Sequence, residues 1–105
     1  MANIDAGRRV TPDTLFMLAS VSKTVVATAV LQAIEDGLFQ LDTHVNDVLP
    51  FPVRHPVHPD RPITVRQLLT HTSSIRDNWN LLTASYVAGD SAMGLRTFLR
   101  RYLSP

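Results

Sequence analysis

Residues 22–36 most constrain what this chain can fold into. Polar side chains recur there at spacings of three or four residues, which places them on one narrow stripe of a helix: Thr24, Thr28, Gln32, Glu35 and Asp36. From Val25 onward the other positions are apolar, and Gly37 follows where a left-handed residue commonly ends a helix. A helix that is apolar on nearly every side is normally buried on most of them. The sequence therefore predicts a helix over about 20–37 that needs covering layers of protein.

The same stretch is too short and too interrupted to cross a membrane, because its apolar run from Val25 to Ile34 contains Thr28 and Gln32. The 105 residues carry 10 basic and 9 acidic side chains, and a net charge of +1 gives no electrostatic reason to expect nucleic acid as a partner. The absence of cysteine excludes disulfides, thiol nucleophiles and cysteine-based zinc sites. The first nine residues have no apolar core, so no secretory signal is expected there.

The middle of the chain combines a proline-rich segment with a clear helix start. Five of the seven prolines fall within residues 50–62, which predicts an extended loop. Thr64 and Gln67 have the spacing of a capping box, in which each side chain bonds the backbone of the other residue. This pattern predicts a helix over about 64–71. A turn-rich link is expected to follow it, and then a weak helix or loop over 81–88.

Two further helix starts are expected from acidic or hydroxyl side chains. Asp42 is expected to cap a short helix that ends at Pro50, and Asp90 or Ser91 to cap a last helix over about 91–103. No segment is predicted to be a strand. The expected fold class is therefore mostly α, in a single partial domain over 1–105.

Ser20 and Lys23 are the first candidates for chemistry. Residues three apart share a face of a helix, with Cβ atoms about 5–6 Å apart, so the lysine amine can reach the serine hydroxyl. An amine kept neutral by burial and by the positive end of a helix can act as a base, and it would make the serine an acyl-accepting nucleophile. The serine N–H, near the helix start, can supply one half of an oxyanion hole. Such a pair also arises by chance in many chains, so its surroundings decide.

Three segments surround this pair in a specific order: TLFMLASVSK at 14–23, AIEDGLFQLD at 33–42 and ITVRQLLTHTS at 63–73. Together they resemble the serine β-lactamase-like family, the group of class C β-lactamases, D-Ala-D-Ala carboxypeptidases and related esterases. The second segment is similar to the family's EEGKLxLDD stretch, and the third to its ITIRHLLTHTSGL. Ser74 stands where the family has glycine, and serine tolerates a left-handed backbone poorly.

The resemblance implies that Ser20 is the nucleophile and Lys23 its partner. It implies a partial α/β fold of the β-lactamase and transpeptidase type, with the nucleophile helix and the start of the all-helical region present and the sheet largely missing. The substrate would be a small amide, β-lactam or ester, and no cofactor or metal is expected. The family's Tyr-x-Asn and Lys-Thr-Gly (or His-x-Gly) motifs are absent, and Lys23 is the only lysine. We therefore expect an internal fragment that is inactive in isolation.

Two histidine patterns allow other interpretations. His55 and His58 have a His-x-x-His spacing that suggests a metal, but a proline-rich backbone does not make the two rings converge, so a solvated loop is expected. His71 can be read as a general base acting with Ser73 or Ser74. No Gly-x-Ser-x-Gly elbow is present, however, and both serines are typical turn residues. A structural role is therefore expected for His71.

A second function class stays open beside the hydrolase. The chain can also be a non-catalytic helical remnant, or an interaction module, that lacks the remainder of an active site. The apolar helix over 22–36 and the apolar stripe on Leu95–Leu103 would then be exposed, and apolar patches beyond a few hundred Å² drive association. Self-association through these faces is the corresponding expectation.

Overall fold

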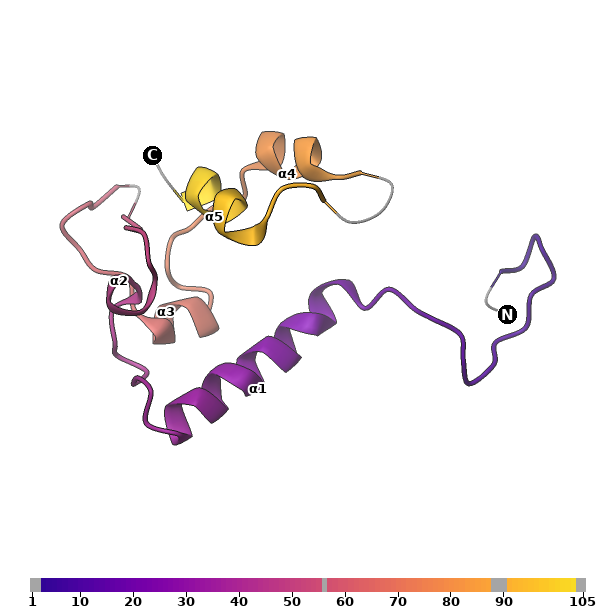
Figure 1. The fold of residues 1–105 in the computed structure, drawn as a ribbon, viewed down its shortest axis with the longest axis horizontal. Helices are drawn as coiled ribbons and strands as arrows, with labels where there is room; N and C mark the ends of the chain where they lie inside the picture. Colours follow the sequence, from indigo (N-terminus) through magenta and orange to yellow (C-terminus); the bar gives the residue numbers. More distant parts are fainter. Residues whose placement is uncertain (1–2, 56, 88–90, 104–105) are drawn as a thin grey trace. The chain divides into compact units, whose positions relative to one another are not determined.

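The structure, a computed structural model, describes residues 3–55, 57–87 and 91–103 (Figure 1). Its helical elements are η1 (Ala19–Val21), α1 (Ser22–Glu35), α2 (Val45–Val48), α3 (Val65–Leu69), α4 (Trp79–Ser85) and α5 (Leu95–Leu103). Over these ranges the extended segments form only two isolated bridges, Asn3 with Arg8 and His44 with Thr64. The expected mostly α class without a sheet is confirmed. The chain divides into two compact units, Met1–Leu31 and Gln32–Pro105.

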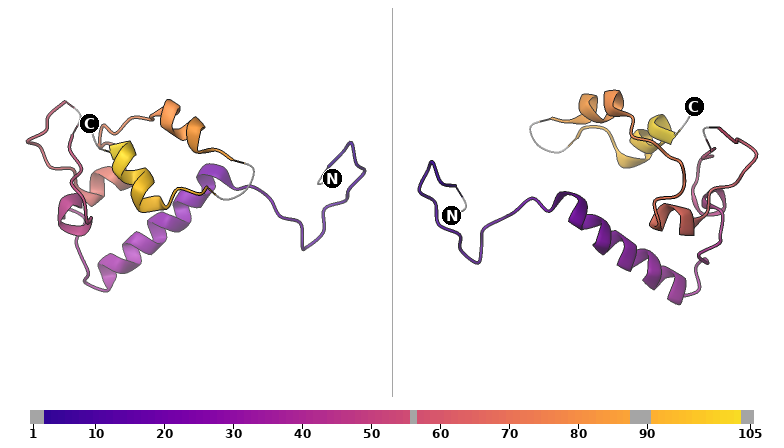
Figure 2. Two further views of the ribbon diagram at one scale, coloured as in Figure 1. Left: turned by 45° about the horizontal axis from the view of Figure 1, so that its top comes forward. Right: turned by 180° about the vertical axis from the view of Figure 1, so that it is seen from behind.

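Helix α1 is the longest element (Figure 2), and the boundary between the two units falls within it, after Leu31. It ends as expected at Gly37, whose φ of +77° is the left-handed conformation that glycine adopts without steric cost. The Gly37 N–H donates to Ile34 O at 3.0 Å, and the Leu38 N–H donates to Ala33 O at 3.1 Å. This pair of bonds is a Schellman motif, which satisfies carbonyls at the helix end.

Two of the five residues in the polar stripe, both threonines, bond backbone carbonyls of the preceding turn. Thr24 Oγ1 donates to Val21 O at 2.8 Å, and Thr28 Oγ1 donates to Thr24 O at 2.9 Å. These hydroxyls therefore need no partner outside the helix. None of the α1 residues is buried, and Val25 and Val26 are 67% and 62% exposed. The helix thus presents apolar surface that the described residues leave uncovered.

The core lies in the second unit. Its buried cluster is Val45, Phe51, Val53 and Ile63, against which Leu49, Ile75, Leu99 and Leu103 pack. The proline-rich loop supplies two of these side chains, and sequence patterning did not single them out. Asn46 holds the loop in place, because its Nδ2 donates to Val53 O at 3.1 Å and its Oδ1 accepts from Val53 N at 2.7 Å.

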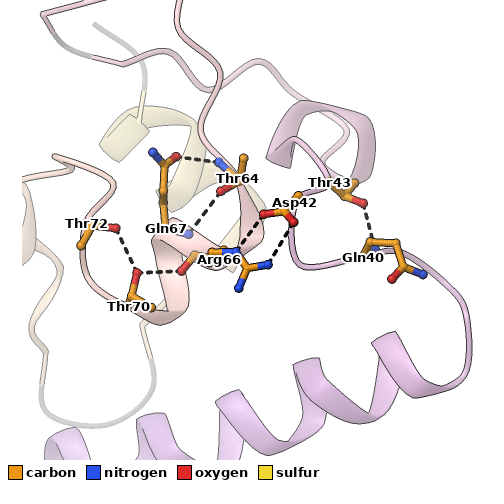
Figure 3. Close-up of polar contacts among 8 residues, drawn as sticks. All are labelled: Gln40, Asp42, Thr43, Thr64, Arg66, Gln67, Thr70 and Thr72. Atoms are coloured by element: carbon orange, nitrogen blue, oxygen red, sulfur yellow. Dashed lines mark hydrogen bonds and ion pairs between the residues drawn. The ribbon is translucent and has the colours of Figure 1, made fainter.

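The expectation that Asp42 caps α2 is wrong. Helix α2 begins after His44, which makes no side-chain cap, while the Asp42 carboxylate accepts two hydrogen bonds from Arg66 (Figure 3). The Arg66 Nε–Asp42 Oδ1 distance is 2.8 Å and the Nη2–Oδ2 distance is 2.9 Å. A planar guanidinium matches a carboxylate in this two-point geometry, so the aspartate is engaged across 24 residues rather than at the adjacent helix.

Hydrogen bonding from Arg66, and then its charge, hold the pKa of Asp42 below its ordinary value. A carboxyl whose pKa is lower in the folded state stabilises the fold above its unfolded value and loses that contribution as the pH falls through the folded one. The Asp42–Arg66 pair should therefore stabilise the fold above about pH 4 and lose this stabilising contribution at lower pH. Carboxyl NMR titration should show the pKa of Asp42 rising when Arg66→Gln removes the partner. An unchanged titration would mean that the two side chains do not pair in solution.

The predicted capping box is present at the start of α3. The Thr64 N–H donates to Gln67 Oε1 at 2.9 Å, and the Gln67 N–H donates to Thr64 Oγ1 at 3.3 Å (Figure 3). The helix is shorter than the expected 64–71, because His71 adopts a left-handed φ of +57°. The N–H groups of His71 and Thr72 bond back to Leu68 O and Gln67 O, as at the end of α1.

The two last helices begin elsewhere than expected. Helix α4 starts at Trp79, because Asn78 Oδ1 accepts from the Leu81 N–H at 3.1 Å and so caps it. Helix α5 starts at Leu95 rather than at 91, since the Gly94 carbonyl accepts the first helical bonds. Ser91 caps no helix and accepts instead from the Met93 N–H within a turn. Asp90, the other expected cap, lies outside the described residues.

Gly37 and His71 occupy equivalent left-handed positions, which gives a pair of opposite predictions. Gly37→Ala should destabilise the fold by about 1 kcal/mol, because a side chain is strained at positive φ even though no atom lies within 4 Å of the added Cβ. His71→Gly should relieve the same strain and stabilise α3 by up to about 1 kcal/mol. Urea unfolding followed by circular dichroism measures both. If both substitutions raised the free energy of unfolding, or both lowered it, the assignment of backbone strain would be wrong.

Candidate active site

Ser20 lies in the short turn that leads into α1. This turn, η1, is a 3₁₀ segment in which the Val21 N–H donates to Leu18 O at 3.1 Å. The expectation that Ser20 occupies the first turn of the α-helix is therefore corrected, since α1 begins two residues later at Ser22. Tight 3₁₀ turns are frequent at helix N-termini, where few residues have formed their i to i−4 bonds.

Lys23 shares a face with Ser20, as the spacing predicts. Lys23 Nζ donates a hydrogen bond to Ser20 Oγ at 3.0 Å, and both side chains are exposed. The first hydrogen bond of the turn is donated by Val21, so the Ser20 N–H has no partner within the turn. The turn η1 and the first turn of α1 thus bring together the hydroxyl and N–H of Ser20 and the amine of Lys23 that contacts the hydroxyl.

Tyr102 and His55 in the second unit make structural hydrogen bonds. Tyr102 OH donates to Asp77 Oδ1 at 3.1 Å and accepts from the Asn78 N–H at 3.2 Å, so it holds α5 to the residues before α4. His55 Nδ1 accepts the backbone N–H groups of Val57 and His58, which occupies the lone pair that a metal would need there. Within the described ranges no three side chains of ligand type lie close enough to hold a metal ion.

The His71 region has the geometry of a turn. His71 and Ser74 both have positive φ, +57° and +60°, and Ser73 between them is buried. No hydrogen bond joins His71 to either serine among the contacts of this described segment. Ser74 keeps the left-handed conformation in which glycine is favoured, at a steric cost to the serine. These features favour a structural role for the segment.

None of the helices in the described ranges is long and apolar enough to span a bilayer. The hydrogen bond from Lys23 Nζ to Ser20 Oγ marks the candidate site in the part of the chain that the structure describes.

Comparisons with known proteins agree on one group. The model of the family described as Beta-lactamase matches residues 1–104. The chain is 40% identical over 77 residues to Penicillin-binding protein 4 of Amycolatopsis lactamdurans, covering 73% of this chain and 20% of that protein. It is 43% identical over 76 residues to Esterase EstB of Burkholderia gladioli, covering 71% of this chain and 19% of that protein.

A shorter match, 46% identical over 50 residues, covers 48% of this chain and 13% of a Beta-lactamase of Yersinia enterocolitica. The chain thus spans about a fifth or less of the length of these curated relatives. No solved structure matches it significantly.

Proposed function

The chain belongs to the Beta-lactamase family, and from this premise we propose that Ser20 is the nucleophile of a serine hydrolase that acts through an acyl-enzyme. The observation that carries the proposal is the 3.0 Å contact between Ser20 Oγ and Lys23 Nζ, at the start of an apolar helix. The proposed substrate is a small amide, β-lactam or ester, in keeping with relatives named as a penicillin-binding protein, an esterase and a β-lactamase.

In the proposed reaction Ser20 Oγ attacks the substrate carbonyl while its proton passes to the neutral amine of Lys23. The Ser20 N–H donates to the oxyanion that forms, and a second donor from elsewhere would complete that site. The tetrahedral intermediate expels its leaving group, which takes up the proton, and a covalent ester on Ser20 remains. Water then hydrolyses this ester and regenerates the serine.

The exposure of this pair indicates what the proposed reaction requires in addition. In the structure the exposed Lys23 Nζ donates to Ser20 Oγ, whereas a general base must accept the proton of the serine hydroxyl. Covering the pair with further protein would disfavour the charge on the amine and exclude bulk water. The uncovered apolar sides of α1 are consistent with such covering layers.

The test uses a chimera in which this chain replaces the matching segment of EstB. The chimera is incubated with a fluorescent penicillin or with a fluorophosphonate probe, digested with trypsin and analysed by mass spectrometry. The tryptic peptide from Val10 to Lys23 should carry the acyl group, and fragmentation should place it on Ser20. Labelling that persists in a Ser20→Ala chimera, or that maps to Ser22, would refute the assignment. The probe that reacts indicates the substrate class.

The exposed apolar residues favour one alternative, a non-catalytic module that associates through α1. Val21 and Leu31 of this region are 61% and 47% exposed, beside the valines already described. This alternative predicts that the isolated chain forms oligomers that a Val25→Lys, Val26→Lys double substitution disperses, as measured by light scattering. It also predicts no acyl-enzyme in the chimera. Acylation of Ser20 would exclude it.

A further inference from the structure

The imidazole of His55 closes a turn in the proline-rich loop. Its Nδ1 accepts the backbone N–H of Val57 at 3.2 Å and the backbone N–H of His58 at 3.0 Å. In a neutral imidazole one ring nitrogen is a donor and the other an acceptor, so these two bonds require the proton to be on Nε2. Asn and Asp commonly cap turns with a side-chain oxygen in the same way, and His55 does so with a nitrogen that can be protonated.

The two ends of the loop are held by contacts that do not involve His55. Asn46 bonds both the N–H and the carbonyl of Val53, at 2.7 and 3.1 Å. Ile63 is 1% exposed, and its carbonyl accepts from the Val45 N–H at 2.9 Å. His55 lies between these anchors and is half-buried. Loss of its two hydrogen bonds would therefore open the turn while the core residues of the loop stay in place.

The surroundings of His55 offer little to offset a positive charge on its ring. The ring of His58 lies beside it, with the two centroids 5.2 Å apart. Neither His55 nor His58 forms an ion pair with a carboxylate within the described ranges. The other charged groups are Arg54, Asp60 and Arg61 on the loop, Asp47 on α2, and Arg100 on α5, whose guanidinium carbon is 6.0 Å from the centroid of the Phe51 ring. Cations outnumber carboxylates in this set.

We infer that His55 is an acid-sensitive cap, which closes its turn only while Nδ1 is unprotonated. A protonated imidazole carries an N–H on both nitrogens, so Nδ1 would point a donor at two backbone donors. Both hydrogen bonds would then be lost, and the N–H groups of Val57 and His58 would turn to water. Because histidine is the side chain that changes charge between about pH 5 and 8, the turn is closed at the upper end of this range and open at the lower end.

Nuclear magnetic resonance of the full 105-residue chain, labelled with ¹⁵N, tests this inference. At about pH 8, scalar couplings across the hydrogen bonds should join His55 Nδ1 to the amide nitrogens of Val57 and His58, and at about pH 5 both couplings should be lost. The Val53 amide should keep its signal, since its partner Asn46 does not titrate. Couplings absent at the higher pH, or retained at the lower one, would overturn the inference. So would a Val53 signal that shifts with the other two, because the whole loop would then be unfolding.

His55→Asn separates the cap from its protonation. The asparagine oxygen can accept the same two N–H groups but does not change charge, so the amide signals of Val57 and His58 should no longer shift with pH. His58→Asn is the matched control, because it removes the neighbouring ring and should leave the shift of the Val57 amide as in the parent chain. A pH response that survives His55→Asn, or that His58→Asn abolishes, would overturn the inference. These signals do not involve Ser20, so absence of an acyl-enzyme in the chimera would reject the proposed function alone.

Discussion

Ser20→Ala is expected to lower kcat/KM of the EstB chimera for p-nitrophenyl esters by a thousandfold or more. The serine oxygen forms the covalent bond in the proposed mechanism, and catalytic groups that act as a unit lose nearly all their effect when one is removed. Ser22→Ala is the matched control, because it removes a hydroxyl two residues away at the start of α1. It should change kcat/KM by only a few-fold.

The isolated 105-residue chain should show no turnover of nitrocefin or p-nitrophenyl esters above its own Ser20→Ala variant. The reason is that Ser20 and Lys23 are exposed and that the motifs implied for the rest of the site are not in this sequence. Substantial hydrolysis that depends on Ser20 in the isolated chain would show that the chain completes its own site. In the chimera, equal kcat/KM values with and without the Ser20→Ala substitution would show that Ser20 is not the nucleophile.

Ile63→Ala is expected to abolish the cooperative unfolding of the second unit. Ile63 is 1% exposed and contributes to a cluster of only four buried side chains, so little other packing compensates. Truncating a buried isoleucine to alanine costs about 2–5 kcal/mol, a large fraction of the stability of a small domain. Urea titration followed by circular dichroism and by amide exchange at Val53 measures the loss.

Ile4→Ala provides the control for that substitution, because it removes the same atoms from a side chain that is 80% exposed. Its effect on unfolding should stay within about 0.5 kcal/mol. A transition of the Ile63→Ala variant that superimposes on the transition of the parent chain would show that this cluster does not hold the second unit together.

Local rules predicted the parts of the fold that depend on neighbours in sequence. Helix α1 with its stop at Gly37, and the capping box of Thr64 and Gln67, follow from periodicity and from side chains that bond backbone within four residues. The contact of Ser20 with Lys23 belongs to this class, because the two residues are only three apart, in the turn η1 and at the start of α1. The residues that decide such features lie within a few positions of one another in the sequence.

The helix starts that were predicted incorrectly lie where more than one residue could have capped the helix, or where the expected cap has another partner. Asp42 had a free helix start beside it, but a two-point bond to Arg66 is available only once the chain brings residues 24 apart together. Gly94, rather than Asp90 or Ser91, sets where α5 begins, and Asn78 sets where α4 begins. A short polar side chain can cap any nearby helix, so composition alone cannot choose among the candidates.

The sequence by itself determined the family segments and predicted the apolar helix and the residues proposed for chemistry, because each depends on residues close together along the chain. Only the tertiary structure decided that Phe51 and Val53 of the proline-rich loop enter the core, since burial depends on what packs against a segment. Only it showed that Ala19 is left-handed, because alanine has no preference for that conformation. The left-handed backbone of Ala19 belongs to a turn closed by the hydrogen bond from the Val21 N–H to Leu18 O, and the alanine side chain does not favour it.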